Sequence, residues 1–250
     1  MPVMDEFKEE RQALKNKSLK DKLSYFFDYY KWHTLAVIAL IAMAISLVTS
    51  FLNHKEWGFY VCLLNTSKYP ETESYVQSFV EYAGIDTDEY EVVFDTDMFI
   101  NEDMTGMDTA ATLQKLTTYT MAGDIDIMIA GSEFIERYAN GQNFHDLRDI
   151  LAPGQIALCK PYFYYVDQTV VDAIAEANKN GQPYEQPYPD PRNPDVMENP
   201  IPVGIYLDNC VTLKENFYFR SEEMVLGVYV NSSRTDEALR FIDYIMDDLQ

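Results

Sequence analysis

The sequence predicts one N-terminal transmembrane helix followed by an α/β domain with a mainly parallel sheet. Three observations support this prediction. Residues 33–53 contain no Asp, Glu, Lys or Arg and form an almost unbroken apolar run. Beyond that run, short apolar stretches alternate with stretches of helical periodicity, as in parallel α/β folds. The apolar stretch at 125–130 is continuous, which is typical of a strand buried on both faces of a parallel sheet.

The apolar run at 33–53 is predicted to cross a membrane. A helix rises about 1.5 Å per residue, so roughly 20 residues span a hydrocarbon core of about 30 Å. Aromatic residues, which prefer the level of the lipid headgroups, lie on both sides of the run. A cleaved signal peptide is the alternative, but its apolar stretch is only about 7 to 15 residues long and ends at a cleavage site of small residues. We find no such site after this run, and we expect an uncleaved anchor in the lipid bilayer.

The charges around the run predict its orientation. Residues 1–32 form a charged segment of helical periodicity with seven basic side chains, whereas Lys55 is the one basic residue in the ten that follow the run. The positive-inside rule places the N-terminus in the cytoplasm and residues 54–250 in an extracellular domain of a single-pass cell-membrane protein. We interpret 1–32 as a solvated stalk; a membrane-surface or partner-binding helix is the alternative.

The predicted extracellular domain is strongly acidic. The whole chain has 19 basic and 41 acidic side chains, for a net charge of −22, and residues 1–32 are close to neutral. The acidic excess therefore lies in residues 54–250. Such a domain repels nucleic acid phosphate, so we expect no nucleic acid partner. An acidic surface also keeps a domain soluble, which is the simpler interpretation of the charge.

The first half of the domain shows strands and helices in alternation. Residues 57–64 form a compact apolar run suited to a buried strand. In 71–84, three aromatic residues recur at helical spacing and a glycine supplies the helix end. The helix at 108–121 begins with a plausible acidic cap. The elements predicted for this half are strands at 57–64, 90–94 and 125–130, helices at 71–84, 108–121 and 132–139, and one or two helical turns at 144–151.

The second half repeats the alternation around a long loop. Seven prolines lie within 182–202, and we predict a long exposed loop there because proline cannot donate to a regular ladder. The chain closes with an amphipathic helix at 235–249. The other elements predicted for this half are strands at 162–166, 203–207 and 224–230 and a helix at 170–179.

The three cysteines favour neither a disulfide scaffold nor a zinc site. Cys62 lies inside an apolar run and is predicted to be buried. Cys159 and Cys210 flank apparent strands, so they are the favoured pair if a disulfide forms. No C-x-x-C spacing is present.

Two segments carry motifs of a known family. In residues 121–151, a turn of small residues and an acidic strand start lead into a hydrophobic strand, a helix, a glycine turn and a D-L-x-x-x-L segment. These parts are Ala122 to Asp124, Ile125 to Ala130, Glu133 to Ala139, Gly141, and Asp146, Leu147 and Leu151. A returning strand from Val228 and a helix at 235–245 follow near the C-terminus. The pattern resembles that of extracellular solute-binding proteins of the type II periplasmic-binding-protein fold.

The resemblance implies a non-catalytic, ligand-binding α/β fold with a cleft. Members of that family run well above 250 residues and have two lobes, whereas residues 54–250 provide 197. We therefore expect a reduced version of the fold, held by an N-terminal membrane helix rather than a lipid.

Motifs of catalysis and of metal binding are largely missing. His33 and His54 bracket the membrane run, which leaves His145 for acid–base chemistry, and no nucleophile or nucleotide-binding motif accompanies it. We interpret His145 as a surface or helix-start residue and expect no enzyme activity and no cofactor. The acidic stretch 95–108 fails the EF-hand pattern, because Thr112 stands where a bidentate Glu is needed. A cation site of another type there, formed by Asp95, Asp97, Asn101 and Asp103, is the alternative to a solvated acidic loop.

A ligand site in an open parallel sheet lies at the carboxyl ends of the strands. Polar residues follow four predicted strands at that edge, and one group begins a helix whose free N–H groups suit an anion. The residues predicted to line a site are Asn65, Thr66, Ser67, Asp95, Asp97, Gly131, Ser132, Glu133, Asp208 and Asn209.

These observations predict a membrane-anchored extracytoplasmic module that binds a ligand or a partner. The expected ligand is a small solute such as a sugar or a peptide. The alternative is a structural or accessory subunit of an envelope complex, with the same fold and a non-functional cleft, that contacts another membrane or envelope protein.

Overall fold

The chain divides into two units, Met1–His54 and Lys55–Gln250. The computed structural model describes residues 18–52, 55–101 and 103–246. In the first unit, helix α2 spans Leu19–Leu52, and its part Lys31–Thr49 is long and apolar enough to cross a membrane. This composition is compatible with a transmembrane helix or a signal sequence. Of the charged segment predicted at 1–32, residues 1–17 lie outside the described residues.

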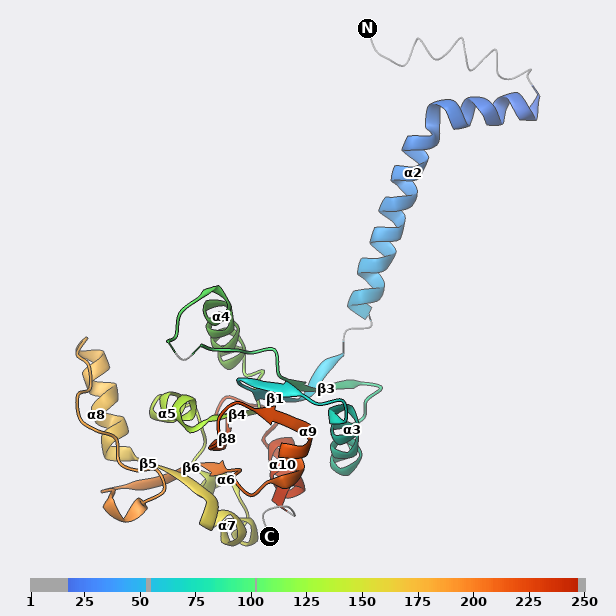
Figure 1. Ribbon diagram of the computed structural model, residues 1–250. Helices are drawn as coiled ribbons and strands as arrows, with labels where there is room; N and C mark the ends of the chain where they lie inside the picture. The colour runs from blue at the N-terminus through green and yellow to red at the C-terminus, as the bar shows by residue number, and fades with distance from the viewer. Residues whose placement is uncertain (1–17, 53–54, 102, 247–250) are drawn as a thin grey trace. The chain divides into compact units, whose positions relative to one another are not determined.

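The second unit is built on a six-stranded mixed sheet (Figure 1). The strand order is β3-β1-β4-β8-β6-β5, in which β1 pairs in parallel with β3 and β4, and the other three pairings are antiparallel. Strands β3, β1, β4 and β6 therefore run in one direction, and β8 and β5 in the other. The strand bounds are β1 Glu56–Leu63, β3 Tyr90–Asp95, β4 Ile127–Gly131, β5 Phe163–Asp167, β6 Pro200–Tyr206 and β8 Met224–Val228.

Helices and a small second sheet surround the six strands. A two-stranded antiparallel sheet joins β2, Thr66–Lys68, to β7, Phe217–Phe219. Short 3-10 helices span Lys160–Tyr162 and Pro194–Val196. The α-helix bounds are α3 Thr72–Ala83, α4 Met107–Ala122, α5 Ser132–Asn140, α6 Leu147–Ile150, α7 Pro153–Cys159, α8 Gln168–Lys179, α9 Val211–Asn216 and α10 Thr235–Met246.

The sheet separates two hydrophobic cores, because alternate residues of a strand point to opposite faces. Phe59 and Val61 of β1 pack on one face with residues of α3 and α10. Tyr60 and Cys62 pack on the other face with residues of α4, α5 and α8. This three-layer arrangement buries both faces of β1 and β4, which explains why their sequences are continuously apolar.

Asp126, immediately before β4, joins several elements at the amino-terminal edge of the parallel strands. Its side chain is fully buried and accepts hydrogen bonds from Tyr60 N at 2.8 Å, Arg234 Nε at 2.9 Å and the Ser232 hydroxyl. Its backbone carbonyl accepts from Tyr229 N at 2.9 Å. Through its carboxylate and its backbone carbonyl, Asp126 therefore connects β1, β4, the end of β8 and the segment that leads into α10.

The α/β class is confirmed, and the sheet contains more antiparallel pairing than the sequence indicated. The predicted strands and longer helices are all present, but β8 and β5 run against the parallel strands. Besides the two 3-10 helices, two short strands and two short α-helices were not predicted. Strands β2 and β7 have three residues each and helix α9 has six, which is too short for a periodic pattern. Helix α7 begins with Pro153. Proline is tolerated at a helix start because the N–H that it lacks would have no partner within the helix there.

The prediction of a loop through 182–202 was wrong at its C-terminal end. Pro200 and Pro202 lie in β6, where β6 pairs with β5 through a shifted register and does not yet pair with β8. Proline is tolerated at such a position because it needs no ladder partner for its nitrogen. Upstream, the loop follows the outer edge of β5, with Tyr165 N donating to Pro191 O at 3.0 Å. The predicted helix at 235–249 ends at residue 246, and 247–250 lie outside the described residues.

All three cysteines are buried, and none of them forms a disulfide. Cys159 and Cys210, the favoured pair from the sequence, do not form a disulfide, and Cys159 Sγ instead lies 3.6 Å from Met246 Sδ. Burial raises the pKa of Cys159 to about 12 and also raises the pKa of Cys62. The thiols of Cys62 and Cys159 therefore stay protonated near neutral pH and pack as apolar groups.

We predict that Asp126→Ala lowers the free energy of unfolding by about 3–5 kcal/mol, because it removes the buried carboxylate that accepts from Arg234 Nε and from the N–H of Tyr60. Urea unfolding of the full chain in detergent, followed by tryptophan fluorescence, measures this loss. Asp88→Ala removes an exposed carboxylate and is expected to change stability by no more than about 0.5 kcal/mol. Equal stability of the two variants would contradict the structural role of Asp126.

Candidate functional site

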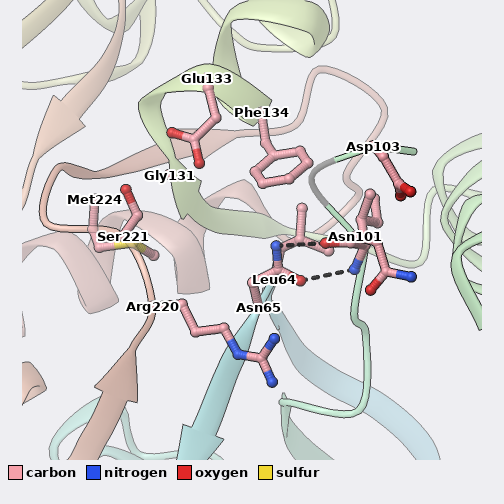
Figure 2. A pocket seen from close by; sticks show the side chains of 11 residues that line it. Leu64, Asn65, Asn101, Asp103, Gly131, Glu133, Phe134, Arg220, Ser221 and Met224 are labelled. Atoms are coloured by element: carbon pink, nitrogen blue, oxygen red, sulfur yellow. Dashed lines mark hydrogen bonds between the residues drawn. The ribbon is translucent and has the colours of Figure 1, made fainter. Parts of the chain in front are cut away.

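Strands β1, β3, β4 and β6 end at the same edge of the sheet, which we call the carboxyl edge. A pocket of about 750 Å³ opens at this edge. Figure 2 shows its lining, which comes from the end of β1, the loop after β3, the start of α5 and the loop before β8. Polar and charged side chains line it together with Phe134, Leu64 and Met224. The pocket lies where the sequence predicted a ligand site, although only some of the predicted residues line it.

Asn65 fixes the wall of the pocket that follows β1. Its backbone is left-handed, with φ of 54°, a conformation that Asn tolerates better than most residues. The side-chain Nδ2 donates to Ile100 O at 3.0 Å, and Oδ1 accepts from Ile100 N at 2.8 Å (Figure 2). The amide is therefore occupied by the neighbouring loop, and Asn65 acts by positioning that loop, which carries Asn101 and Asp103.

The start of α5 forms a second wall. Gly131 ends β4, and the carboxylate of Glu133 lies over it, so closely that a Cβ on Gly131 would stand 2.5 Å from Glu133 Oε1. Ser132 N donates to Glu223 O at 3.0 Å. Glycine at 131 therefore leaves room for the carboxylate of Glu133 at the mouth of the pocket.

Arg220 supplies a cation to the pocket from the loop before β8. Its guanidinium carbon lies 4.9 Å from the ring centroid of Phe99, a distance at which a cation interacts with an aromatic face. Among the described residues, Arg220 has no hydrogen-bond or ion-pair partner, and no dashed line reaches it in Figure 2. By contrast, Asp103 in the same lining accepts hydrogen bonds from Thr105 N and Thr105 Oγ1. Arg220 is thus an exposed guanidinium that is available to an anionic group.

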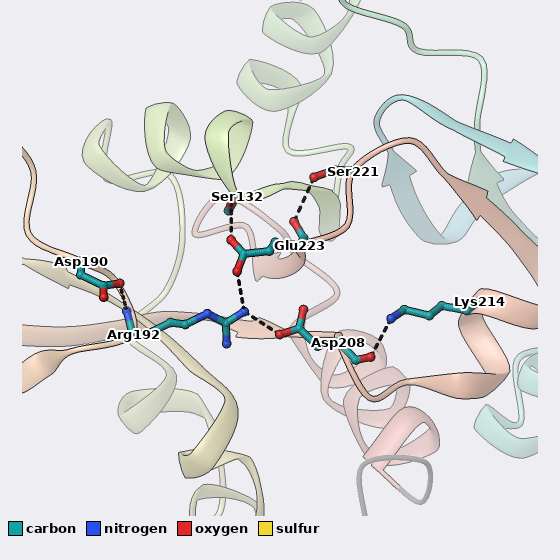
Figure 3. A network of polar contacts seen from close by, with 7 residues as sticks. All are labelled: Ser132, Asp190, Arg192, Asp208, Lys214, Ser221 and Glu223. Atoms are coloured by element: carbon teal, nitrogen blue, oxygen red, sulfur yellow. Dashed lines mark hydrogen bonds and ion pairs between the residues drawn. The ribbon is translucent and has the colours of Figure 1, made fainter.

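A network of charged residues borders the pocket (Figure 3). Arg192 donates to Asp208 Oδ2 at 2.5 Å and to Glu223 Oε1 at 3.1 Å, and its guanidinium lies 3.5 Å from the centroid of the Tyr206 ring. Ser132 Oγ donates to Glu223 Oε2 at 3.3 Å. Ser132 and Asp208, both predicted site residues, are therefore brought together through Arg192 and Glu223. Ser132 Oγ and Asp208 Oδ2 are engaged in this network, whereas Asp208 Oδ1 is buried with no hydrogen-bond partner among the described residues.

Asp95 belongs to a buried cluster instead of the pocket. Its carboxylate accepts hydrogen bonds from Lys115 Nζ at 2.6 Å, from Asp97 N at 2.8 Å and from the hydroxyl of Tyr60. Burial alone would raise the pKa of Asp95, but the hydrogen bonds from Lys115 and Tyr60 outweigh it and hold the pKa below its usual range. Asp95 therefore anchors α4 to the end of β3.

The other predicted residues lie outside the lining of the pocket. Thr66 is buried, and its hydroxyl donates to Leu64 O at 3.1 Å. Ser67 lies in β2 opposite Tyr218, and Asp97 and Asn209 are exposed. Asn65, Gly131 and Glu133 are the predicted residues that line the pocket itself.

In the part of the chain that the structure describes, we find neither a cluster of metal-ligating side chains nor a catalytic arrangement around His145. No three His, Cys, Asp or Glu residues there are arranged to hold a metal ion, and Asp95 is occupied by Lys115. His145 is half-buried and precedes Asp146, which caps α6. Burial lowers the pKa of His145, which keeps its ring neutral at pH 7.

Sequence reasoning missed Arg220, Glu223 and Arg192. It considered only residues that follow strands of a mainly parallel sheet, and none that precede a strand. Because β8 is antiparallel to β4, its start lies at the carboxyl edge and carries Arg220 and Glu223 there. Arg192 lies in the proline-rich loop, whose path along β5 is set by tertiary contacts. The charged triplet Arg220, Glu222 and Glu223 directly before an apolar run was the one signal available in the sequence.

Comparison of the chain with models of known protein families and with curated proteins gives no match.

We predict that Asp95→Asn destabilises the protein by about 1.5–3 kcal/mol at pH 7, because it removes the charged partner of Lys115. The carboxyl pKa is near 3.9 in the unfolded chain and lower in the folded protein, so this stabilisation is present above about pH 4 and is lost as the pH falls through the folded pKa. Urea unfolding of both proteins across this range measures the difference, which should shrink toward about pH 2. Asp97→Asn, an exposed neighbour, serves as the control; a pH-independent gap for Asp95→Asn would contradict this assignment.

Proposed function

We propose that this protein is a non-catalytic binding module, anchored by one membrane helix, whose extracytoplasmic domain binds a small polar solute at the carboxyl edge. The observation that carries the proposal is the pocket of about 750 Å³ with the exposed guanidinium of Arg220 in its lining, which has no hydrogen-bond or ion-pair partner among the described residues. A volume in this range suits small ligands, and a few convergent polar groups beside apolar walls are typical of binding sites.

The chemistry of the lining favours a ligand that carries a carboxylate. A guanidinium binds a carboxylate through two parallel hydrogen bonds, and it gains more from this partner than from a neutral hydroxyl. Phe99 holds one face of Arg220, and Phe134 adds apolar surface on the opposite wall. Amino acids, peptides and acidic sugars all meet this requirement.

The length and composition of α2 support a role at the membrane. The described residues do not bury the apolar side chains between Lys31 and Thr49. These side chains therefore need an apolar environment, which a lipid bilayer supplies. With the basic residues before it, this helix favours an anchor with a cytoplasmic N-terminus and an extracellular domain. The motifs at 121–151 further favour a reduced relative of the type II solute-binding proteins, which fits a binding role.

A second candidate function is that of an accessory subunit in an envelope complex. Tyr69 and Tyr218 form an exposed aromatic pair at the small β2–β7 sheet, with 40% and 53% of their surface exposed. Exposed tyrosines are enriched at protein interfaces. In this alternative, the engaged side chains of Ser132 and Asp208 belong to a closed, non-functional cleft.

We predict that at least one amino acid or short peptide raises the thermal midpoint of the full chain in detergent in a dose-dependent manner. A ligand that binds the folded state stabilises it by RT ln(1 + [L]/Kd), so a screen of sugars, amino acids, peptides and Ca²⁺ reveals the class. Arg220→Gln should weaken the binding at least tenfold, since a charge-assisted hydrogen bond contributes about 1.5–3 kcal/mol.

Lys179→Gln is the matched control, because it removes an exposed cation outside the lining of the pocket. It is expected to leave the affinity unchanged. A sharp melting transition with no shift for any compound would contradict the binding proposal and favour the accessory subunit. A shift that Arg220→Gln leaves intact would place the ligand elsewhere.

A further inference from the structure

A second pocket, of about 430 Å³, lies between α5, α8 and the proline-rich loop. Two tyrosines of that loop, Tyr184 and Tyr188, stack on each other with ring centroids 5.7 Å apart and an interplanar angle of 28°. Both line the pocket, and Tyr188 keeps 42% of its surface exposed. Glu136 lines the pocket from α5, and Asn178 lines it from α8.

This second pocket has the chemistry of a site for an organic cation. Glu136 has no hydrogen-bond or ion-pair partner among the described residues, and burial raises its pKa above the usual range. Burial removes part of the water that stabilises the charged carboxylate, and a cation beside it would stabilise the charged form instead. The faces of tyrosine rings attract ammonium groups as well. Arg137 also lines the pocket, but with Glu133 and Glu136 the lining still carries one excess negative charge.

The two pockets adjoin. Glu133, in the first turn of α5, lines both of them, with the cation Arg220 in the first pocket and the carboxylate Glu136 in the second. The second pocket extends along α5 from Glu133 to Asn140. Seven residues of helix correspond to about 10 Å, and an extended peptide covers about 3.3–3.6 Å per residue. The lining of the second pocket alone is therefore as long as two to three extended residues.

The net charge of the chain favours a zwitterionic ligand over a simple anion. With a net charge of −22, the protein repels a simple anion at long range, whereas a ligand with no net charge is not repelled. A ligand with a carboxylate at one end and an ammonium at the other matches both pockets. In a single amino acid these two groups are attached to the same carbon, whereas Arg220 and Glu136 line different pockets.

We propose that the two adjoining pockets form one groove that binds a short peptide with free ends, its carboxylate at Arg220 and its ammonium between Glu136 and the tyrosine pair. This inference rests on the proposed function, since it names the ligand class of the same edge. The side chains of the peptide lie along α5, where Asn140 and Asn178 offer hydrogen bonds to its backbone.

Calorimetric titration of the full chain in lipid nanodiscs tests this inference. The probes are tripeptides of the form Ala-X-Ala with each amino acid at X, and then the N-acetylated and C-amidated forms of the best binder. We expect N-acetylation to weaken binding at least tenfold in the wild type and to have no further effect in Glu136→Gln. C-amidation should behave in the same way with Arg220→Gln. Such paired losses identify which end of the peptide each residue contacts.

Glu185→Gln is the matched control, because it neutralises an exposed carboxylate on the same loop that does not line the pocket. It should bind all peptides like the wild type. If an amino acid or a sugar binds through Arg220 and the tripeptides do not, or if N-acetylation has no effect, the peptide inference is overturned and the binding function stands. If no solute of any class binds, both are overturned.

Discussion

The fold of the second unit depends on the buried carboxylate of Asp126. A buried charge is costly unless its oxygens are paired, and here Tyr60, Ser232 and Arg234 supply the donors. These donors come from segments far apart in the sequence, so the carboxylate is satisfied only when β1, β4, β8 and α10 are assembled. Because the register of β4 between β1 and β8 is fixed at Asp126, the residues at the other end of β4 are fixed as well.

The antiparallel insertion of β8 into the sheet gives the carboxyl edge its character. In a fully parallel sheet this edge would carry only the loops that follow strands. The reversed β8 adds the segment before a strand, and with it Arg220 and Glu223. Glu223 takes part in the network with Arg192, whereas Arg220 lies over Phe99 and has no ion-pair partner among the described residues. Glu223 therefore belongs to a closed polar border, whereas Arg220 belongs to the open pocket in which we propose that the ligand binds.

Much of the fold was accessible from the sequence, and less of the site was. The continuous apolar runs and helical periodicities located the main strands and helices, because burial on both faces leaves a strong pattern. Strand direction left no such pattern, so the segment before β8, with Arg220, was not considered for the site. Asp95 was predicted as a ligand because it follows a strand, yet Lys115 and Tyr60 occupy it. Position along a strand can be inferred from sequence, but the occupancy of a side chain depends on distant residues.

Hydrogen–deuterium exchange of the full chain in nanodiscs, with and without the best-binding tripeptide or solute, tests the account most directly. Backbone amides become protected where a ligand is held or a loop is ordered by it. The account predicts protection confined to the loop after β3, the first turns of α5, the segment around Arg220 and the loop that carries Tyr184. Protection at the β2–β7 sheet instead, or no change at saturating ligand, would contradict the assignment of the carboxyl edge as the binding site.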